Sequence, residues 1–447
     1  MRIGHGGGVR AGRTVVAAAV AAGLLAAGCS RPGTPLPAGG GGPAGPLPTG
    51  PVRGEHITVV LPSYANPPSE LISAFERETG ATVTVDTASW EDVHDRIVTA
   101  EAAGRAAGDV TEVDWSWVGQ FGQAGWYTPL ETSLPAGVLA DLDNMSSFAH
   151  GGHVLAACYN NDVRIGAYNK ELFTRAGIGA PPRTFAELRD DLSALQSSGV
   201  SAHPLALSGA ATEGSATLWY LLTKAMGGEL LDAKGQPAFA DPGSGGYRAL
   251  AFEVEAVRKG WAAPSAPSTT DVQADALFTG GQAAVQLAGN PGELPVANDP
   301  SQSKIVGEAG YFVEPGLTTT GGPGPTYGLP EGLGIPKAST HKAAALAFIA
   351  FMMRPEVGEQ LFAGGTLPCR RSAVHALSAG GKLQGGATIE EQIGHVTPLF
   401  RGGPPPWYPT FSTEVAAQVN AAIKGEITVD AAIGRLADAV RRLAAGG

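Results

Sequence analysis

Three short β-branched segments separated by two amphipathic helical segments constrain the fold of this chain most strongly. Strands are predicted at residues 57–61, 82–85 and 109–113, each rich in Val, Ile and Thr. Helices are predicted between them, from a cap at Ser69 to Gly80 and from a Ser89–Asp92 capping box to near Gly104. A β-α-β-α-β order predicts a parallel sheet covered by helices.

A second α/β unit is expected after residues 154–157. The rest of the chain is predicted to form helices at 184–195, 216–226 and 246–259, a strand at 283–287, and helices at 343–353, 413–424 and 429–443. The helix at 343–353 is apolar nearly all round and is therefore expected to be buried. About 390 residues of this kind exceed the size of one hydrophobic core, so two domains are expected.

The amino terminus has the order of a secretory signal. Basic residues without any acid precede an apolar run from Val15 to Gly28, which is shorter than the ~20 residues that span a bilayer. The small residues before Cys29 resemble a bacterial lipobox. This resemblance implies a lipoprotein signal peptide at 1–28, cleavage before Cys29 and a lipid on its sulfur. The alternative is an ordinary signal peptide that contains a cysteine.

Residues 29–54 are dominated by Pro and Gly and offer no apolar face, which predicts a disordered tether. The formal net charge of the whole chain is −11, and loss of the arginine-bearing leader makes it more negative. This balance argues against nucleic acid as a partner, because phosphate binding needs a basic face. It also argues against adsorption to anionic lipid headgroups, so that the lipid would have to supply the membrane attachment.

The chain contains three cysteines. If Cys29 carries lipid, Cys158 and Cys369 remain as a pair in an oxidising compartment. The residues alone leave two states open, a disulfide or two buried thiols.

Five separated segments together resemble one known family. The first is Gly108–Asp114 with Trp115 and Ala124–Trp126, and the second is Val154–Asn161 with Ala167–Phe173. The third and fourth are Pro181–Leu188 and Phe278–Ala284. The last is Gly332–Pro336 with Ala344–Met353 and Gly365–Arg370. In this order and spacing they resemble the extracellular solute-binding proteins, family 1, of carbohydrate ABC importers, the group that includes maltose-binding protein.

The resemblance implies an α/β fold of two lobes in the class II periplasmic-binding-protein arrangement. Each lobe would hold a central sheet flanked by helices, and crossover segments would form the hinge. The expected lobes are 55–157 with 330–368 and 158–329 with 369–447. The family usually has proline at the position of Cys158. In the family fold, Cys158 and Cys369 fall on connecting segments, where a disulfide would tie the hinge without crossing the ligand cleft.

By the same resemblance, a sugar binds between the lobes and an ABC permease receives it. A monomer on the outer face of the membrane is expected, with no cofactor or metal. Sugar sites need aromatic faces and planar hydrogen-bonding groups, which should lie on loops at the carboxyl ends of strands. The predicted ligand-binding residues are Tyr64, Asn66, Asp114, Trp115, Asn160, Asn161, Glu213, Trp219, Asn290, Tyr327, Glu331 and Arg370.

Several alternatives remain open at this point. Trp115 and Trp219 also suit a hydrophobic core, and Arg370 also suits an ion pair between the lobes. Trp407 and Tyr408 fit a wall of the cleft as well as a plug held by the neighbouring prolines. A non-sugar solute such as a glycerophosphodiester is a second ligand class. A secreted glycoside hydrolase using Asp114 and Glu331 is a different kind of function.

Overall fold

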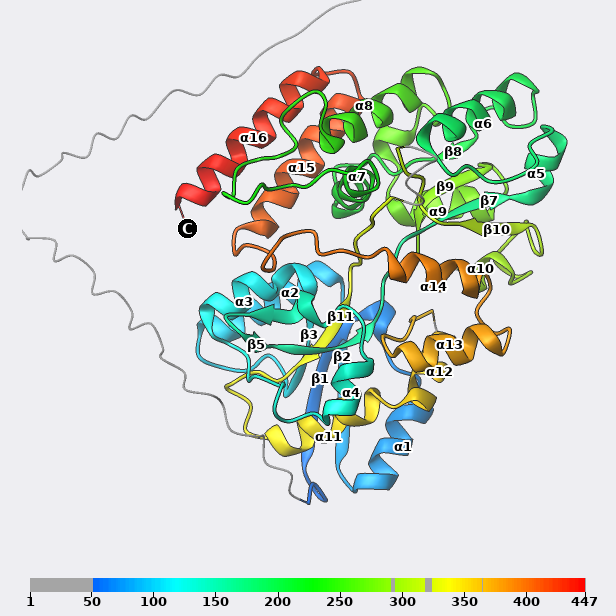
Figure 1. Cartoon of the computed structure of the whole chain (residues 1–447). Helices are drawn as coiled ribbons and strands as arrows, with labels where there is room; N and C mark the ends of the chain where they lie inside the picture. Colours follow the sequence, from blue (N-terminus) through cyan, green and yellow to red (C-terminus); the bar gives the residue numbers. More distant parts are fainter. Residues whose placement is uncertain (1–50, 291–293, 318–323, 364, 447) are drawn as a thin grey trace, which may run out of the picture. The chain divides into compact units, whose positions relative to one another are not determined.

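The computed structural model describes residues 51–290, 294–317, 324–363 and 365–446 (Figure 1). The predicted signal peptide, Cys29 and all but the last residues of the predicted tether lie outside the described residues. Within the described part of the chain, none of the helices is both long and apolar enough to cross a membrane.

The first sheet has five strands in the order β2-β1-β3-β11-β6. These strands are β1 His56–Pro62, β2 Thr82–Ala88, β3 Val110–Asp114, β6 Ala156–Asn160 and β11 Glu331–Gly334. The three predicted strands pair in parallel, with β1 between β2 and β3, as the β-α-β-α-β order predicts. The sheet also contains an antiparallel strand that the sequence did not predict, because β11 is antiparallel to both β3 and β6. This strand enters the sheet from the other lobe rather than through a crossover helix.

The predicted helices of the first lobe are confirmed as α1, α2 and α11, with one corrected cap. Besides the sheet, the elements of this lobe are η1 Ser63–Ala65, α1 Ser69–Thr79, α2 Trp90–Ala102, η2 Trp115–Trp117, α3 Val118–Ala124, α4 Ala136–Asp141, η3 Met145–Phe148, β4 Ala149–His150, β5 His153–Val154 and α11 Lys342–Met352. Ser89 caps α2 by accepting from the backbone N–H of Asp92 at 3.1 Å. Ser69 is the first helical residue of α1 rather than its cap. The buried helix expected at 343–353 is α11.

The second sheet has four strands in the order β10-β7-β9-β8. They are β7 Ile165–Asn169, β8 Leu205–Ala206, β9 Val285–Gly289 and β10 Ala309–Phe312. Strand β8 is parallel to β9, whereas β7 is antiparallel to both β9 and β10. The carboxyl ends of β8 and β9 therefore meet the start of β7 at one edge.

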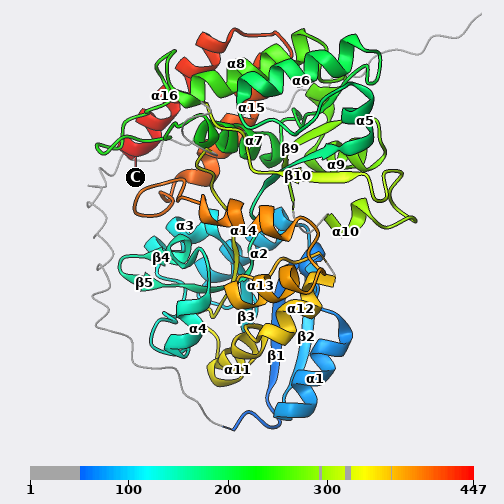
Figure 2. The ribbon, with the colours of Figure 1, turned by 45° about the vertical axis from the view of Figure 1, so that its right-hand side comes forward.

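Helices of the second lobe pack around this sheet and against one another, and α7 is the most buried of them (Figures 1 and 2). They are α5 Lys170–Arg175, α6 Phe185–Ser197, α7 Glu213–Ala225, α8 Gly245–Arg258, η4 Ala266–Ser268, α9 Asp271–Thr279, α10 Leu294–Ala297, α15 Tyr408–Ile423 and α16 Val429–Gly446. Helix α15 begins at Tyr408 rather than near residue 413. Pro409 lies in its first turn, where proline costs no hydrogen bond, so the proline run does not delay the helix.

Three further helices lie on the segment between α11 and α15. They are α12 Pro355–Ala363, α13 Arg371–Ala379 and α14 Gly386–Gly394. They share a small core with Val163 and Ile165, at the point where the chain passes from the first sheet to the second. Cys158 and Asn160 both lie in β6 of the first sheet. The lobe boundaries expected at 157/158 and 368/369 remain a prediction.

Cys158 and Cys369 form a disulfide with their Cα atoms 5.8 Å apart. Of the two states left open by the residues, the structure has the cross-link. The backbone beside it is paired as well, because the N–H of Asn161 donates to the carbonyl of Leu367 at 2.7 Å. The disulfide thus joins β6 to the segment that precedes α13.

Candidate functional site

Several predicted site residues meet at the edge of the first sheet where β1 and β3 end. Tyr64 follows β1, and Asp114 is the last residue of β3. Glu331 begins β11 and pairs in register with both Asp114 and Asn160. Because β1 and β3 are parallel and β11 runs the other way, the chain places all four residues at one edge.

Glu331 is the centre of a hydrogen-bond network at this edge. Its Oε1 accepts from the Tyr64 hydroxyl at 2.5 Å, and its Oε2 accepts from Asn160 Nδ2 at 3.0 Å. The Tyr159 hydroxyl also lies 3.0 Å from Oε2. Burial raises the pKa of Glu331 to about 7, against the hydrogen bonds that lower it. Tyr64 as a whole residue is 56 % exposed, so the network ends at an aromatic residue that solvent reaches.

Asp114 is held by groups from two neighbouring segments. The backbone N–H of Ser116 donates to its Oδ1 at 2.8 Å, and Trp90 Nε1 donates to its Oδ2 at 3.3 Å. Burial raises the pKa of this carboxyl to about 8 even so. Its orientation is therefore fixed by the start of α2 and by the turn after β3.

Glu112 lies two residues before Asp114 on β3, so both side chains point to the same face of the sheet. It is fully buried, and its Oε2 lies 2.9 Å from the Tyr159 hydroxyl. Burial, with the nearby Glu331 as a second cause, raises the pKa of Glu112 well above its usual range. Glu112 is therefore a third buried carboxyl group beside Asp114 and Glu331, the two that the sequence predicted.

Trp115 joins this edge to an aromatic cluster of the second lobe. Its ring centroid lies 5.0 Å from that of Tyr408 and 5.6 Å from that of Tyr327. The Tyr408 hydroxyl donates to Glu213 Oε1 at 3.0 Å. Three of the predicted residues, Trp115, Glu213 and Tyr327, are therefore brought together through Tyr408.

Two cavities are lined by residues of these groups. The larger has a volume of about 630 Å³ and is lined by Tyr64 and Asn66, with residues of α1 and β2 and with Leu361 and Thr366. Ligand sites for small molecules commonly have volumes of ~300–1,000 Å³. The smaller has about 130 Å³ and lies between Trp115 and the Val396–Pro404 segment. Tyr64 and Trp115, which follow the neighbouring strands β1 and β3, each line one of these cavities.

The corresponding edge of the second sheet carries an ion pair and a strained residue. Arg164 Nη2 donates to Asp162 Oδ2 at 2.8 Å, both side chains being largely buried. Ala288 has a positive φ of 58°, which is uncommon for a residue with a Cβ, and its N–H donates to Glu314 Oε1 at 2.8 Å. A small cavity of about 20 Å³ is lined by Arg164, Asp271 and Gln286.

Trp219, Asn161 and Asn290 lie apart from these groups, as does Arg370, which is described next. Trp219 is fully buried in the core of the second lobe, and its Nε1 donates to the carbonyl of Gly246 at 2.9 Å. Asn161 is fully buried and accepts from Asn144 Nδ2 at 2.7 Å, within the connecting segment. Asn290 follows β9 at the second-sheet edge and is half-buried.

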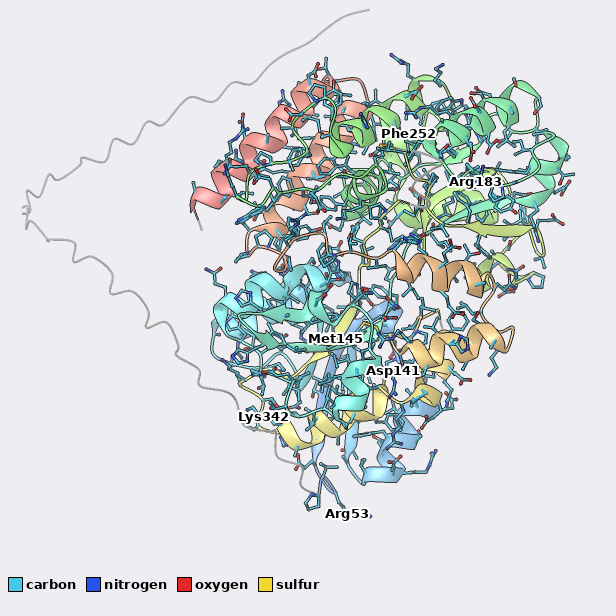
Figure 3. All side chains as sticks on the ribbon, in the orientation of Figure 1. Arg53, Asp141, Met145, Arg183, Phe252 and Lys342 are labelled. Atoms are coloured by element: carbon cyan, nitrogen blue, oxygen red, sulfur yellow. A yellow bond between two sulfur atoms is a disulfide. The ribbon has the colours of Figure 1, made fainter. Side chains whose placement is uncertain are left out.

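Arg370 forms an ion pair rather than standing free at the site. Its Nε donates to Asp141 Oδ2 at 2.7 Å, and its Nη1 donates to the carbonyl of Met353 at 3.2 Å. Figure 3 shows Asp141 at the end of α4, toward α13. The ion pair thus joins α4 to the segment that begins α13, beside the disulfide.

Sequence reasoning missed Trp90, Glu112 and Tyr159. Trp90 follows β2 as Tyr64 follows β1, so the rule that selected Tyr64 would have found it. Glu112 was identifiable from the alternation along β3, which places it on the face of Asp114. Tyr159 had no such signal, because its position depends on an irregularity in the pairing of β6 with β11. Among the described residues, no group of three His, Cys, Asp or Glu side chains has metal-site geometry.

The model of the bacterial extracellular solute-binding protein family matches residues 62–359. The diacetylchitobiose-binding protein DasA of Streptomyces coelicolor is 25 % identical over 85 % of this chain and 88 % of its own length. The Probable amino-acid ABC transporter periplasmic-binding protein y4oP of Sinorhizobium fredii is 28 % identical over 48 % of this chain. The match spans 47 % of that relative's length.

Solved structures share the fold at lower identity. A solute-binding protein of an ABC transporter from Agrobacterium radiobacter K84, in complex with ribitol, has a TM-score of 0.77 at 21 % identity. The match covers 88 % of this chain and all of that one. Maltose-bound MalE3 of T. maritima has a TM-score of 0.76 at 22 % identity, over 87 % and 99 % of the two chains.

These likenesses confirm the expected α/β fold of two lobes, that of the periplasmic binding proteins. The family match covers well over half of the chain. It sets aside the glycoside hydrolase that the pair Asp114 and Glu331 suggested, because the family binds solutes and does not transform them. The chain belongs to the bacterial extracellular solute-binding protein family.

Proposed function

We propose that this protein is a sugar receptor, held at the outer face of the membrane by a lipid on Cys29, which delivers a di- or oligosaccharide to an ABC permease. The observation that carries the choice of sugar is the edge of the first sheet. There the accessible ring of Tyr64 is hydrogen-bonded to Glu331, beside Asn160 and Asp114. An aromatic face suits the C–H side of a sugar ring, and fixed carboxyl and amide groups suit its hydroxyls.

The charge of the two edges supports a neutral solute over an anionic one. Carboxyl groups dominate both edges, with Asp114 and Glu331 on the first and Asp162 and Glu314 on the second. The one arginine described at these edges, Arg164, is paired with Asp162. A phosphodiester would bring a full negative charge to edges that are rich in acids, and the one arginine described there already has a carboxylate partner. This argument disfavours the glycerophosphodiester alternative.

Two of the similar proteins support a sugar, although y4oP is named for amino acids. DasA is described as binding diacetylchitobiose, and the T. maritima structure contains maltose. The proposed mechanism is closure of the two lobes around the ligand, after which the permease recognises the closed form. No bond of the ligand is made or broken.

The lipid on Cys29 is tested separately from ligand binding. We expect the full-length chain, expressed in a bacterium that processes lipoproteins, to partition into the membrane fraction. A Cys29→Ser variant should be found in the soluble extracytoplasmic fraction with its binding activity intact. Equal membrane association of the two proteins would contradict the proposed anchor.

Sugar binding is tested by calorimetric titration of the purified protein with neutral mono-, di- and oligosaccharides. Saturable binding of at least one of them, with the sugar recovered unchanged, is the expected result. A glycerophosphodiester serves as the matched anionic probe and should not bind. Binding of the anionic probe alone would contradict the proposal.

A further inference from the structure

We infer that Glu112 and Tyr159 are positioning residues for Glu331. The three side chains hold one proton in addition to that of the Tyr159 hydroxyl, and the site binds sugar while this added proton is present. The inference rests on the proposed function for its binding readout. Its first test needs no ligand.

The Tyr159 hydroxyl bridges the carboxyl groups of Glu112 and Glu331. The Tyr159 oxygen lies 2.9 Å from Glu112 Oε2 and 3.0 Å from Glu331 Oε2. A tyrosine hydroxyl has one proton to donate, and an ionised carboxylate can only accept. With both carboxylates ionised, one of the two contacts would lack a proton. A single added proton completes the chain: one carboxylic acid donates to Tyr159, and Tyr159 donates to the other carboxylate.

The surroundings of the pair favour keeping that proton. Glu112 is fully buried, and Glu331 is 6 % exposed. The titratable groups that face them are Asp114 on β3, Tyr64 after β1, Asp162 after β6 and Tyr127 after α3. All of these are acids, so each adds negative charge or none. Ionising both neighbouring carboxyl groups in this buried, acidic environment costs more free energy than ionising one of them.

The shared proton orients the group that faces the ligand. Tyr159 and Asn160 hold Glu331 Oε2, and this leaves Oε1 to accept from Tyr64, the exposed aromatic residue of the site. If the proton is lost, one Tyr159 contact loses its hydrogen and becomes repulsive. Glu331 and Tyr64 are then no longer fixed in one orientation. Because burial raises the pKa of both glutamates, the proton is bound at lower pH and lost as the pH rises above the apparent pKa of the pair.

The first test detects the proton directly in the ligand-free protein. At pH 6.5, the infrared C=O band of protonated carboxylic acids should be weaker in Glu112→Gln than in the wild type. Glu253→Gln is the matched control, since Glu253 is a fully buried glutamate of α8, and its band intensity should fall as well. If Glu253→Gln loses intensity and Glu112→Gln does not, the inference is overturned, whether or not any sugar binds.

The second test is the pH profile of sugar binding, measured by calorimetry between pH 6 and pH 9. For one linked proton, the wild-type Kd should rise by up to about tenfold per pH unit above the apparent pKa of the pair. In Glu112→Gln the side-chain amide supplies the missing donor at every pH, so the pH profile should be flat. Glu253→Gln should keep the wild-type profile.

A second variant covers the case in which Glu112→Gln does not fold. Tyr159→Phe removes both contacts, and its Kd at pH 6.5 should be about tenfold higher than that of the wild type, a value typical of one lost hydrogen bond to a charged group. A wild-type Kd that stays constant from pH 6 to pH 9 would overturn the inference while leaving sugar binding intact. Absence of any sugar binding would instead count against the proposed function alone.

Discussion

At the scale of single residues, the site and the core contain buried carboxyl groups with opposite consequences. At the sheet edge, Glu331 accepts hydrogen bonds from Tyr64 and Asn160, and Tyr159 bridges Glu331 and Glu112. Glu253, in contrast, is fully buried on α8 with neither oxygen hydrogen-bonded to any described residue. The first kind orients side chains for a ligand, whereas the second only destabilises the folded state.

Removing the aromatic face of Tyr64 should weaken sugar binding. Tyr64→Ala loses both the exposed ring and the hydroxyl bonded to Glu331, and we expect its Kd to rise by about tenfold or more. Tyr64→Phe keeps the ring and should show a smaller rise. Tyr247→Phe is the matched control, because that hydroxyl donates to Asp430 on the surface of the other lobe. Calorimetric titration gives the three values, and an unchanged Kd in Tyr64→Ala would contradict the proposed site.

Replacing Glu253 by an apolar residue of similar length should stabilise the protein. Burial raises the pKa of Glu253 well above its usual range, so folding carries a penalty that is largest above that folded-state pKa. As the pH falls toward 4.5, the unfolded carboxyl also becomes protonated and the penalty shrinks. We expect Glu253→Met to raise the free energy of unfolding at pH 7.5 by ~1–3 kcal/mol, with a smaller gain at pH 5.

The control for this prediction is on the same helix. Glu255 is paired with Arg189 at 2.8 Å and is partly exposed. Glu255→Met should therefore give no gain in urea denaturation at either pH. Equal gains from the two variants, or a gain from Glu253→Met that grows as the pH falls, would show that burial of an unpaired carboxyl is not the cause.

At the scale of secondary-structure elements, local patterns predicted most of the structure, and long-range pairing supplied the rest. The strands β1, β2 and β3 and the helices α2 and α11 follow from β-branched runs, a serine cap and an apolar face. The antiparallel insertion of β11 could not be predicted that way, because it depends on residues more than 200 positions apart meeting in space. Tyr159 was missed for the same reason, and Trp219 and Arg370 suited loop sites by sequence although their partners are elsewhere.

The disulfide between β6 and the segment before α13 should contribute to stability rather than to ligand affinity. It closes a loop of 211 residues, for which the chain-entropy model gives about 5 kcal/mol, and native disulfides commonly contribute ~2–5 kcal/mol. We expect Cys158→Ala/Cys369→Ala to unfold at lower urea concentration by an amount in that range. Its Kd for sugar should stay within about twofold of the wild type.

Mass spectrometry of the non-reduced protein provides the check on this prediction. A linked peptide pair containing Cys158 and Cys369 is the expected product. Recovery of both cysteines as free thiols would contradict the cross-link. A large loss of sugar affinity in the double variant, without unfolding, would place the disulfide in the ligand site instead of the connecting segment.

At the scale of the whole molecule, two α/β lobes present carboxyl-rich edges and share an aromatic contact through Trp115 and Tyr408. The family assignment makes the chain a solute-binding protein. Its charge and its aromatic residues favour a neutral, hydroxylated solute over a phosphodiester. The affinity should therefore depend weakly on ionic strength, since screening acts mainly on charged partners.

The most direct test of the sugar-receptor proposal is a thermal-unfolding screen of the mature protein against neutral sugars and a glycerophosphodiester, each from below to far above its expected Kd. A cognate sugar at 100 times its Kd should stabilise the fold by ~2.7 kcal/mol and raise the Tm in a saturable way. The sugar should be recovered chemically unchanged, and the phosphodiester should leave the Tm where it was. A Tm that responds to the phosphodiester and to none of the sugars would contradict the account.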